Sequence, residues 1–169
     1  REAGAIAFSN GKSSVVNTRI MRNALLYAKD FGALIVHHTE DPFLVEGTVM
    51  TSGEMATRLG LPAATKAAET IVLERDVRLV ETTGGRYHAA TISCAESLAV
   101  VRQAKARKIG VTCGVSINHL TLNELDIGSY RTYFNIRPPL RSEEDRAAMV
   151  RGIVSGDIDV IVSSHDPQD

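Results

Sequence analysis

Polar side chains that can bind metal ions or transfer protons recur directly after short apolar runs of this chain. Carboxylates and neutral imidazoles supply the lone pairs that a zinc-type ion needs, and a carboxylate can also act as acid and base. In a (β/α) barrel such groups gather at the carboxyl ends of the strands. The residues with this placement are Asn10, His38, Glu40, Asp41, His88, Thr91, Asn118, His119, Arg137, Ser164 and His165.

Nucleophilic catalysis has weaker support in the sequence. Ser164 and His165 are adjacent, so on a strand they would point to opposite faces, and no orienting acid accompanies them. Cys94 and Cys113 stand alone without an activating pattern. We interpret both cysteines as packing residues, and neither a disulfide framework nor a zinc knuckle is predicted.

Six short apolar runs predict strands, and several are nearly continuous, as in parallel strands covered on both faces. They span residues 3–8, 33–38, 86–92, 111–115, 131–135 and 159–163. Between them, capping residues and apolar spacing predict helices. Asn17 caps the first of these helices and Gly32 ends it; Ser142 begins the last and Gly156 ends it. The other predicted helices span residues 62–80 and 94–108, with shorter ones at 51–59 and 121–126.

Strands that alternate with helices predict an α/β architecture with a parallel sheet. An open doubly wound sheet and a (β/α) barrel both fit the order. No Gly-x-Gly-x-x-Gly or P-loop sequence follows a strand, which disfavours the nucleotide-binding form. The polar residues at strand ends favour the barrel.

The composition is that of an ordinary soluble domain: 169 residues, 44% hydrophobic and 23% charged, with a net charge of -1. This charge balance excludes an electrostatic case for nucleic acid, and no apolar run is long enough for a membrane span. A reducing, cytoplasmic setting is predicted. The chain opens in a strand and stops after one, so we expect it to be an ordered piece of a larger polypeptide.

Six segments in order resemble dihydroorotase and related cyclic amidohydrolases. One resembles Ala-Phe-Ser/Thr-Asp-Asp-Gly, another His-x-Glu-Asp, a third the approach to a histidine strand. The later ones resemble Val-Thr-Pro-His-His-Leu, Asn-Pro-Pro-Leu-Arg and the strand before Asp-His-Ala-Pro-His. The segments are residues 7–11, 38–41, 83–93, 115–120, 137–146 and 159–169.

The resemblance implies one partial (β/α)8 barrel of the metal-dependent amidohydrolase kind across residues 1–169, with about six strand–helix units. These would be roughly strands three to eight. The first strands, with a His-x-His metal motif, and a small flanking β-domain would then lie outside the chain. A partial barrel leaves strand edges unpaired, so a homo- or hetero-oligomer is expected.

The same resemblance implies that four metal positions are altered. Asn10, Thr91, Asn118 and Ser164 stand where carboxylate or imidazole ligands would be, and a neutral amide or hydroxyl is a poor ligand for a zinc-type ion. Ser164 also replaces the catalytic aspartate, and Asp166 could take that place only after a shift of register. His119 is a candidate ligand if its loop shifts by one residue.

Three residues are predicted to contact substrate: Arg137, Asn118 and His165. Arg137 replaces a family asparagine and puts a permanent cation beside the pocket. It could grip a carboxylate or pair with Glu40 or Asp41, and the sequence leaves both roles open.

These substitutions predict a dihydroorotase-like protein of pyrimidine biosynthesis that is catalytically inactive and needs no cofactor. By resemblance, its role would be structural or regulatory beside aspartate transcarbamoylase. The alternative is an active cyclic amidohydrolase that binds zinc through the upstream motif together with His119 or Asp166. A third hypothesis is a small-molecule binding module anchored by Arg137.

Overall fold

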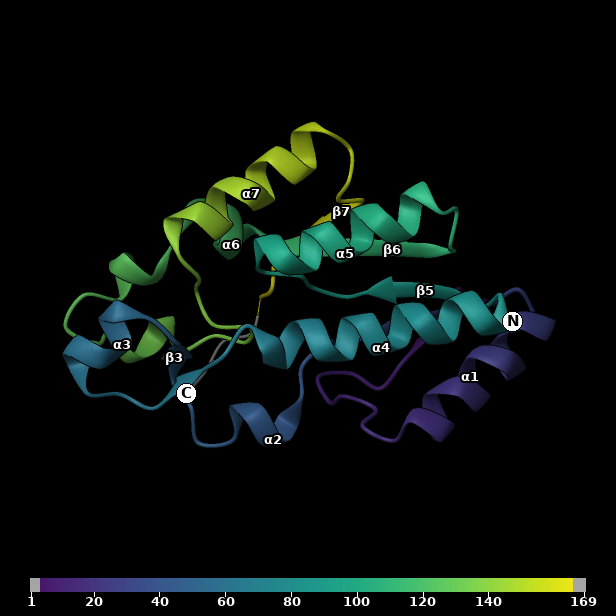
Figure 1. Ribbon diagram of the computed structural model, residues 1–169, viewed down its shortest axis with the longest axis horizontal. Helices are drawn as coiled ribbons and strands as arrows, with labels where there is room; N and C mark the ends of the chain where they lie inside the picture. Colours follow the sequence, from purple (N-terminus) through teal and green to yellow (C-terminus); the bar gives the residue numbers. More distant parts are fainter. Residues whose placement is uncertain (1–3, 166–169) are drawn as a thin grey trace.

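The computed structural model describes residues 4–165, which form a parallel sheet covered by helices (Figure 1). The sheet has five strands in the order β1-β2-β5-β6-β7. Their bounds are β1 Ala7–Ser9, β2 Leu34–His37, β5 Arg86–Ala89, β6 Val111–Ser116 and β7 Val160–Val162. A second, two-stranded parallel sheet joins β3 (Met50–Thr51) to β4 (Ala63–Ala64).

The long helices are α1 (Thr18–Asp30), α4 (Ala67–Thr83), α5 (Ala95–Ala106) and α7 (Glu143–Val154). They contact one another in this order, α1 with α4, α4 with α5 and α5 with α7, so they follow the order of the strands (Figure 1). The short elements are α2 (Pro42–Val45), α3 (Glu54–Leu59), α6 (Ile117–Thr121), and the 3-10 helices η1 (Glu124–Ile127) and η2 (Thr132–Phe134).

The strand order distinguishes the two architectures that the sequence left open. A doubly wound sheet reverses its strand order at a switch point, whereas the strands of a barrel follow one another in sequence. Here every strand of the main sheet pairs in parallel with the next one along the chain, apart from the excursion through β3 and β4. The arrangement is that of a partial (β/α) barrel, as predicted.

Local hydrogen bonds explain where the first and last long helices begin. The Asn17 side chain accepts hydrogen bonds from the amides of Arg19 and Ile20, and the Ser142 hydroxyl accepts one from the Asp145 amide. Each satisfies amide groups that lack a partner in the first helical turn. Both predicted caps are confirmed.

Three sequence predictions of local structure are wrong. The short helix expected at residues 121–126 is divided, because α6 ends at Thr121 and η1 begins at Glu124. Residues 131–135 are predicted to form a strand, but they contain the 3-10 helix η2. Arg131, which directly precedes η2, lies over the rings of Tyr133 and Phe134. The helix expected from residue 62 begins only at Ala67, because Ala63 and Ala64 pair with β3. Sheet pairing across a distance therefore overrides the local signal.

The apolar core lies between the main sheet and the long helices. Its fully buried side chains include Met21, Leu25, Leu73, Tyr87, Ile92, Leu98, Val115 and Met149. The outer strands are less covered: Ile6 is 86% exposed beside β1, and Ile161 is 50% exposed in β7. Across the described residues, none of the helices has the length and apolarity needed to cross a membrane.

Candidate functional site at the carboxyl ends of the strands

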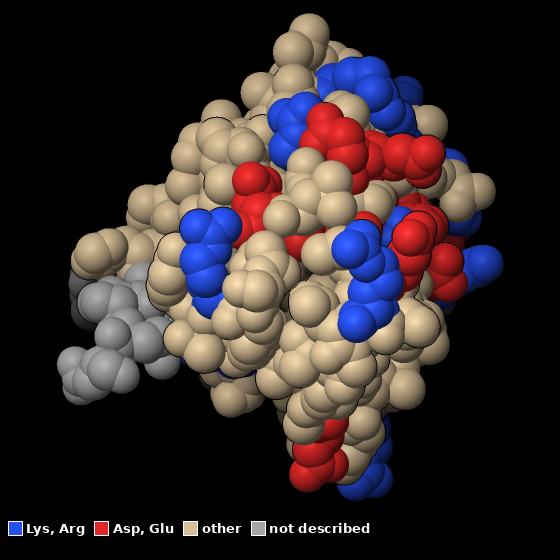
Figure 2. All heavy atoms as spheres, turned by 90° about the vertical axis from the view of Figure 1, so that its left-hand side faces the viewer, with Lys and Arg blue, Asp and Glu red and all other residues tan. Residues whose placement is uncertain are grey.

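The predicted site residues follow the carboxyl ends of the parallel strands, which share one edge of the sheet. The strands run toward the left of Figure 1, and Figure 2 views the molecule from that side. Lys and Arg lie among Asp and Glu on this face, with apolar and neutral surface between them. No single sign of charge dominates, in keeping with the net charge of -1.

A cleft of about 530 Å³ opens beside the ends of β1 and β2. The loop after β1 supplies one wall, the segment after β2 supplies another, and Arg137 reaches in from the segment that follows η2. The lining residues are Lys12, Ser13, Ser14, His38, Glu40, Pro42, Val45, Glu46, Gly47 and Arg137.

Glu40 is the central acidic group of this cleft. Its Oε2 lies 3.2 Å from Nε2 of His38, and its Oε1 lies 4.0 Å from Nη1 of Arg137. Oε1 is buried and has no hydrogen-bond partner among the described residues. A carboxylate oxygen in this state is open to a donor, because a buried acceptor without a partner costs free energy.

Arg137 is largely engaged by the backbone. Its Nη2 donates to the carbonyl oxygens of Thr48 at 2.6 Å and Val45 at 3.3 Å, while Nη1 donates to the Thr48 hydroxyl. Of the two roles that the sequence left open, the geometry favours pairing with Glu40 and pinning of residues 45–48. A contact between Arg137 and substrate stays a prediction.

The four altered metal positions lie outside the lining of this cleft. Asn10 is exposed and donates to the carbonyl of Ser13 at 3.4 Å, and Ser164 is exposed with a positive φ of 48°. Thr91 and Asn118 are half-buried. Asn118 lies in the first turn of α6, where its main-chain amide donates to the Ser116 hydroxyl.

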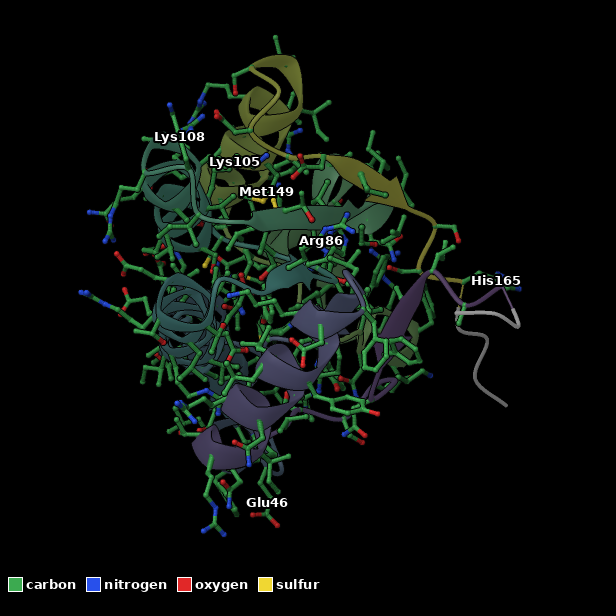
Figure 3. All side chains as sticks on the ribbon, turned by 90° about the vertical axis from the view of Figure 1, so that its right-hand side faces the viewer. Glu46, Arg86, Lys105, Lys108, Met149 and His165 are labelled. Carbon is green, nitrogen blue, oxygen red and sulfur yellow. The ribbon has the colours of Figure 1, made fainter. Side chains whose placement is uncertain are left out.

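The histidines near the strand ends have separate environments. His88 Nδ1 lies 2.8 Å from the Thr112 hydroxyl, and burial lowers the pKa of His88 despite the nearby Asp159. His165 is exposed, and Figure 3 shows it far from Glu46, a residue of the cleft. Neither His165 nor Asn118 is among the residues that line the cleft with Arg137, and their predicted contacts with substrate remain untested.

His119 is a buried histidine with one ring nitrogen that has no hydrogen-bond partner among the described residues. It is 2% exposed, and its Nε2 lies 3.2 Å from the carbonyl oxygen of Pro139, which requires Nε2 to carry the proton. Nδ1 is then an acceptor, and no described residue donates to it. Burial lowers the pKa of His119, so the ring is held neutral.

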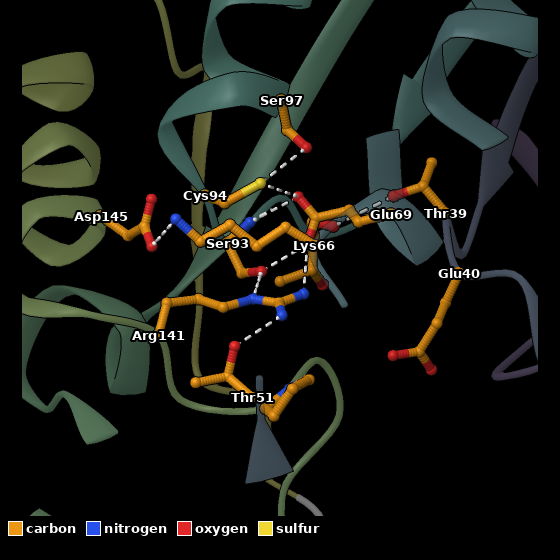
Figure 4. A network of polar contacts seen from close by, with 12 residues as sticks. Thr39, Glu40, Thr51, Lys66, Glu69, Ser93, Cys94, Ser97, Arg141 and Asp145 are labelled. Atoms are coloured by element: carbon orange, nitrogen blue, oxygen red, sulfur yellow. Dashed lines mark hydrogen bonds and ion pairs between the residues drawn. The ribbon is translucent and has the colours of Figure 1, made fainter. Parts of the chain in front are cut away.

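A buried polar network lies behind the site (Figure 4). Arg141 donates from Nε to the Ser93 hydroxyl at 2.8 Å, from Nη1 to Thr51 Oγ1 at 3.1 Å and from Nη2 to Glu69 Oε2 at 3.4 Å. Glu69 also accepts hydrogen bonds from the amide and the hydroxyl of Ser93. This network joins α4, the segment after β5, β3 and the segment before α7.

The cysteines behave as the sequence predicted. Both are buried, and burial is the largest cause that raises each thiol pKa. Glu69 adds to the effect at Cys94, while Asp159 adds to it at Cys113, whose pKa rises to about 12. A thiol that stays protonated is a poor nucleophile, so neither cysteine has the character of a catalytic group.

The residues present do not fit a zinc-type ion. Asn10, Thr91 and Ser164 offer neutral oxygens, and within the described residues no three or more His, Cys, Asp or Glu side chains gather as a metal site. Asp166, the register-shift candidate for the catalytic carboxylate, lies outside the described residues.

The structure brings Lys12, Ser14, His38 and Glu40 together in the cleft. Sequence reasoning named His38 and Glu40 among the polar residues at strand ends, but it gave no role to Lys12 or Ser14. The available signal was the His-x-Glu-Asp segment directly after β2. Its spacing shows that the residues are close, but the approach of Arg137 depends on the path of a segment almost one hundred residues later.

Residues 1–97 match the family described as Dihydro-orotase-like. The chain belongs to this dihydroorotase-like family. It is 42% identical over 167 residues to a dihydroorotase of Pelotomaculum thermopropionicum and 43% identical over 167 residues to one of Lactiplantibacillus plantarum. Each alignment covers 99% of this chain and 39% of the relative, so the chain spans about two fifths of these dihydroorotases.

Solved structures show the same fold. A D-hydantoinase (dihydropyrimidinase) from Thermus sp. matches with a TM-score of 0.81 and 24% identity, over 98% of this chain and 38% of the other. A dihydroorotase from Campylobacter jejuni matches with a TM-score of 0.67 and 15% identity, over 98% of this chain and 43% of the other. The predicted family and the partial-barrel fold are both confirmed.

Proposed function

We propose that this chain belongs to a cytoplasmic dihydroorotase-like protein of pyrimidine biosynthesis that has kept the barrel and lost metal-dependent hydrolysis. The observation that carries the proposal is the set of neutral side chains at the four metal positions, Asn10, Thr91, Asn118 and Ser164. A single such change could tune a metal site. Four together remove the charge that balances two cations.

Catalysis needs more than a pocket of the correct shape. Hydrolysis of a cyclic amide requires an activated water and a group that takes and returns a proton. Ser164 cannot hold a stable negative charge near neutral pH, and no hydrogen bond from its hydroxyl to a base is recorded among the described residues. Glu40, the buried carboxylate of the cleft, lies 3.2 Å from His38 Nε2 through Oε2 and 4.0 Å from Arg137 Nη1 through Oε1, so its negative charge is balanced by these neighbours.

Turnover is the first test. The full-length protein is assayed for ring closure of carbamoyl aspartate and ring opening of dihydroorotate, beside the dihydroorotase of Lactiplantibacillus plantarum. We expect no turnover above background in either direction. Turnover within tenfold of that enzyme would overturn the proposal and favour the active alternative.

A restoration series tests the alignment of the altered positions. Ser164→Asp alone should remain inactive, since Asn10, Thr91 and Asn118 are also neutral. The fourfold change Asn10→Asp, Thr91→His, Asn118→His and Ser164→Asp should raise zinc binding above that of the single variant. Strong activity from Ser164→Asp alone would show that the other three positions are not part of the metal site.

The alternative, an active cyclic amidohydrolase, draws support from one observation. His119 has a buried Nδ1 with no partner among the described residues, which suits a metal ligand. In this form zinc would bind to the upstream His-x-His motif, outside this chain, together with His119 or Asp166. Loss of zinc in His119→Gln, in a protein that turns over, would identify this form.

The role of an inactive barrel is proposed to be assembly with aspartate transcarbamoylase. Support for this role comes from the family resemblance. The two proteins from one organism are mixed and measured by sedimentation. We expect a complex larger than either protein, and separate sedimentation at micromolar concentration would remove this role.

A further inference from the structure

Asn10 and Gly11 form the only Asn-Gly pair in the chain. Both residues are exposed and lie in the tight turn that follows β1. The Ser13 amide donates to the Asn10 carbonyl at 3.4 Å across this turn, and Gly11 takes a positive φ of 65°. Glycine adopts this conformation without strain because it has no Cβ. The turn therefore places an asparagine side chain beside an unhindered main-chain nitrogen at the surface.

The two groups of this pair are held weakly. Among the described residues, the Asn10 side chain makes one hydrogen bond, from Nδ2 to the Ser13 carbonyl at 3.4 Å, which is long for such a bond. The Gly11 amide donates to the Ser9 hydroxyl at 3.0 Å, a single exposed bond that water can replace. No described atom lies within 4 Å of the position that a Cβ on Gly11 would take. The side chain is therefore free to turn toward the Gly11 nitrogen.

Asn17, a second exposed asparagine nearby, has the opposite character. Its Oδ1 accepts hydrogen bonds from the amides of Arg19 at 2.9 Å and Ile20 at 3.2 Å, so the side chain is fixed against the start of α1. The residue that follows it is Thr18, whose β-branched side chain crowds the main-chain nitrogen. The two asparagines thus differ both in their next residue and in how firmly their side chains are held.

We propose that Asn10 is a site of self-modification, where the Gly11 nitrogen displaces ammonia and water then leaves an aspartyl or isoaspartyl residue. In the first step a bond forms between the Gly11 nitrogen and Asn10 Cγ, and the bond between Cγ and Nδ2 breaks. The Gly11 nitrogen gives its proton to hydroxide, while Nδ2 takes a proton from water and leaves as ammonia. The attack is intramolecular between neighbouring residues, so it needs no second molecule to be brought into place.

Water opens the resulting five-membered ring in the second step. Addition of water at Asn10 Cγ gives aspartate and leaves the main chain unchanged. Addition at the main-chain carbonyl carbon gives isoaspartate, whose main chain is longer by one carbon. Either product replaces a neutral amide with a carboxylate, so the net charge of the chain falls by one, from -1 to -2.

The reaction alters one wall of the cleft. Lys12 and Ser13 line the cleft and follow directly in the same turn. A carboxylate at residue 10 adds a negative charge close to the Lys12 ammonium, and isoaspartate also shifts the turn through its extra main-chain carbon. The reaction does not depend on the loss of hydrolysis proposed above. The other three altered metal positions stay neutral, so zinc binding is not expected to follow from it.

Peptide mapping of the full-length protein tests the proposal. Trypsin cuts after Lys12 and Arg19, which leaves Asn10 and Asn17 in separate peptides. Fresh protein is incubated at pH 6 and pH 8 and digested, and mass spectrometry follows the exchange of the side-chain amide for a carboxylate. We expect Asn10 to convert at least roughly tenfold faster than Asn17, and faster at pH 8 because hydroxide takes the Gly11 proton.

Two variants test the cause of the reaction. Gly11→Ala places a methyl group beside the attacking nitrogen and should slow conversion of Asn10 roughly tenfold, with circular dichroism as the check that the protein stays folded. Thr18→Gly gives Asn17 a glycine neighbour but keeps its bonds to α1, so Asn17 should still convert more slowly than Asn10.

Three results would contradict the proposal. Conversion of Asn10 no faster than that of Asn17 in the unaltered protein would overturn it, and so would an unchanged rate in Gly11→Ala. Conversion of Asn17 as fast as that of Asn10 in Thr18→Gly would show that the weak hold on the Asn10 side chain plays no part. None of these readouts involves zinc or turnover, so their outcome is separate from that of the proposed function.

Discussion

Two arginines four residues apart, Arg137 and Arg141, make glutamate pairs of opposite character. Arg141 and Glu69 are 2% and 1% exposed, and their network satisfies both side chains. Arg137 and Glu40 are 37% and 8% exposed, and Nη1 lies 4.0 Å from Oε1, which has no hydrogen-bond partner among the described residues. The first pair fixes the fold and the second lies at the cleft.

The difference between the two pairs shows which part of the polar structure holds the fold. The buried network joins the segments behind the sheet edge. There, removal of one charged side chain leaves its partner buried without a compensating charge. The cleft pair is near water, where an ion pair contributes little to stability. Substitutions at the cleft are therefore expected to lower the free energy of unfolding only slightly, while substitutions in the network should lower it strongly.

The largest expected effect is at the buried pair. Arg141→Met removes the donor to Glu69, Ser93 and Thr51 and leaves the Glu69 carboxylate uncompensated. We expect a loss of about 3 to 5 kcal/mol in the free energy of unfolding, measured by urea denaturation. A loss below about 1 kcal/mol would contradict this, because it would mean that Arg141 contributes as little to stability as is expected of Arg137.

Acid should weaken the buried region through Asp145. Burial would raise the pKa of this carboxyl, but hydrogen bonds from the Ala95 amide, Lys66 and Ser142 lower it. Its contribution is therefore complete above the ordinary value of 3.8 and is lost as the pH falls below it toward the folded-state pKa. Urea midpoints from pH 5 to pH 2.5 should fall more steeply in wild type than in Asp145→Asn, and parallel slopes would contradict this assignment.

At the cleft, Arg137→Met is the matched counterpart of Arg141→Met. It removes the bonds to the Thr48 and Val45 carbonyls, which water can replace. The expected loss in the free energy of unfolding is about 0.5 to 1 kcal/mol. A loss as large as that of Arg141→Met would mean that the cleft pair also holds the fold.

The smallest effect is expected for Glu40→Gln. The change keeps the shape of the side chain and removes the negative charge of a carboxylate whose Oε1 has no hydrogen-bond partner among the described residues. We expect the free energy of unfolding to change by less than about 0.5 kcal/mol. A clear gain in stability would show that the glutamate is retained against its cost, as binding groups often are.

The regular elements were predictable wherever a local signal decides them. Asn17 and Ser142 begin helices because their side chains bond to amides two or three residues later, which is visible in sequence. Residues 131–135 carry strand-forming side chains but receive no partner strand, so η2 forms instead. Ala63 and Ala64 show the reverse, since pairing with β3 overrides the signal from Pro62.

The site was predictable in outline only. The strand-end positions follow from the alternation of elements, and the neutral residues at Asn10 and Ser164 are visible in the sequence. The cleft depends on side chains far apart in the chain, such as Glu40 and Arg137, whose approach only the folded arrangement fixes.

Metal content tests the central claim most directly. The full-length protein and the dihydroorotase of Lactiplantibacillus plantarum are each expressed with added zinc and purified separately by the same procedure. The zinc content of each is measured by elemental mass spectrometry. Neutral residues at the metal positions predict less than about 0.1 zinc per chain, because neutral oxygens bind zinc weakly. One or more zinc ions per chain, retained after dialysis, would contradict the account.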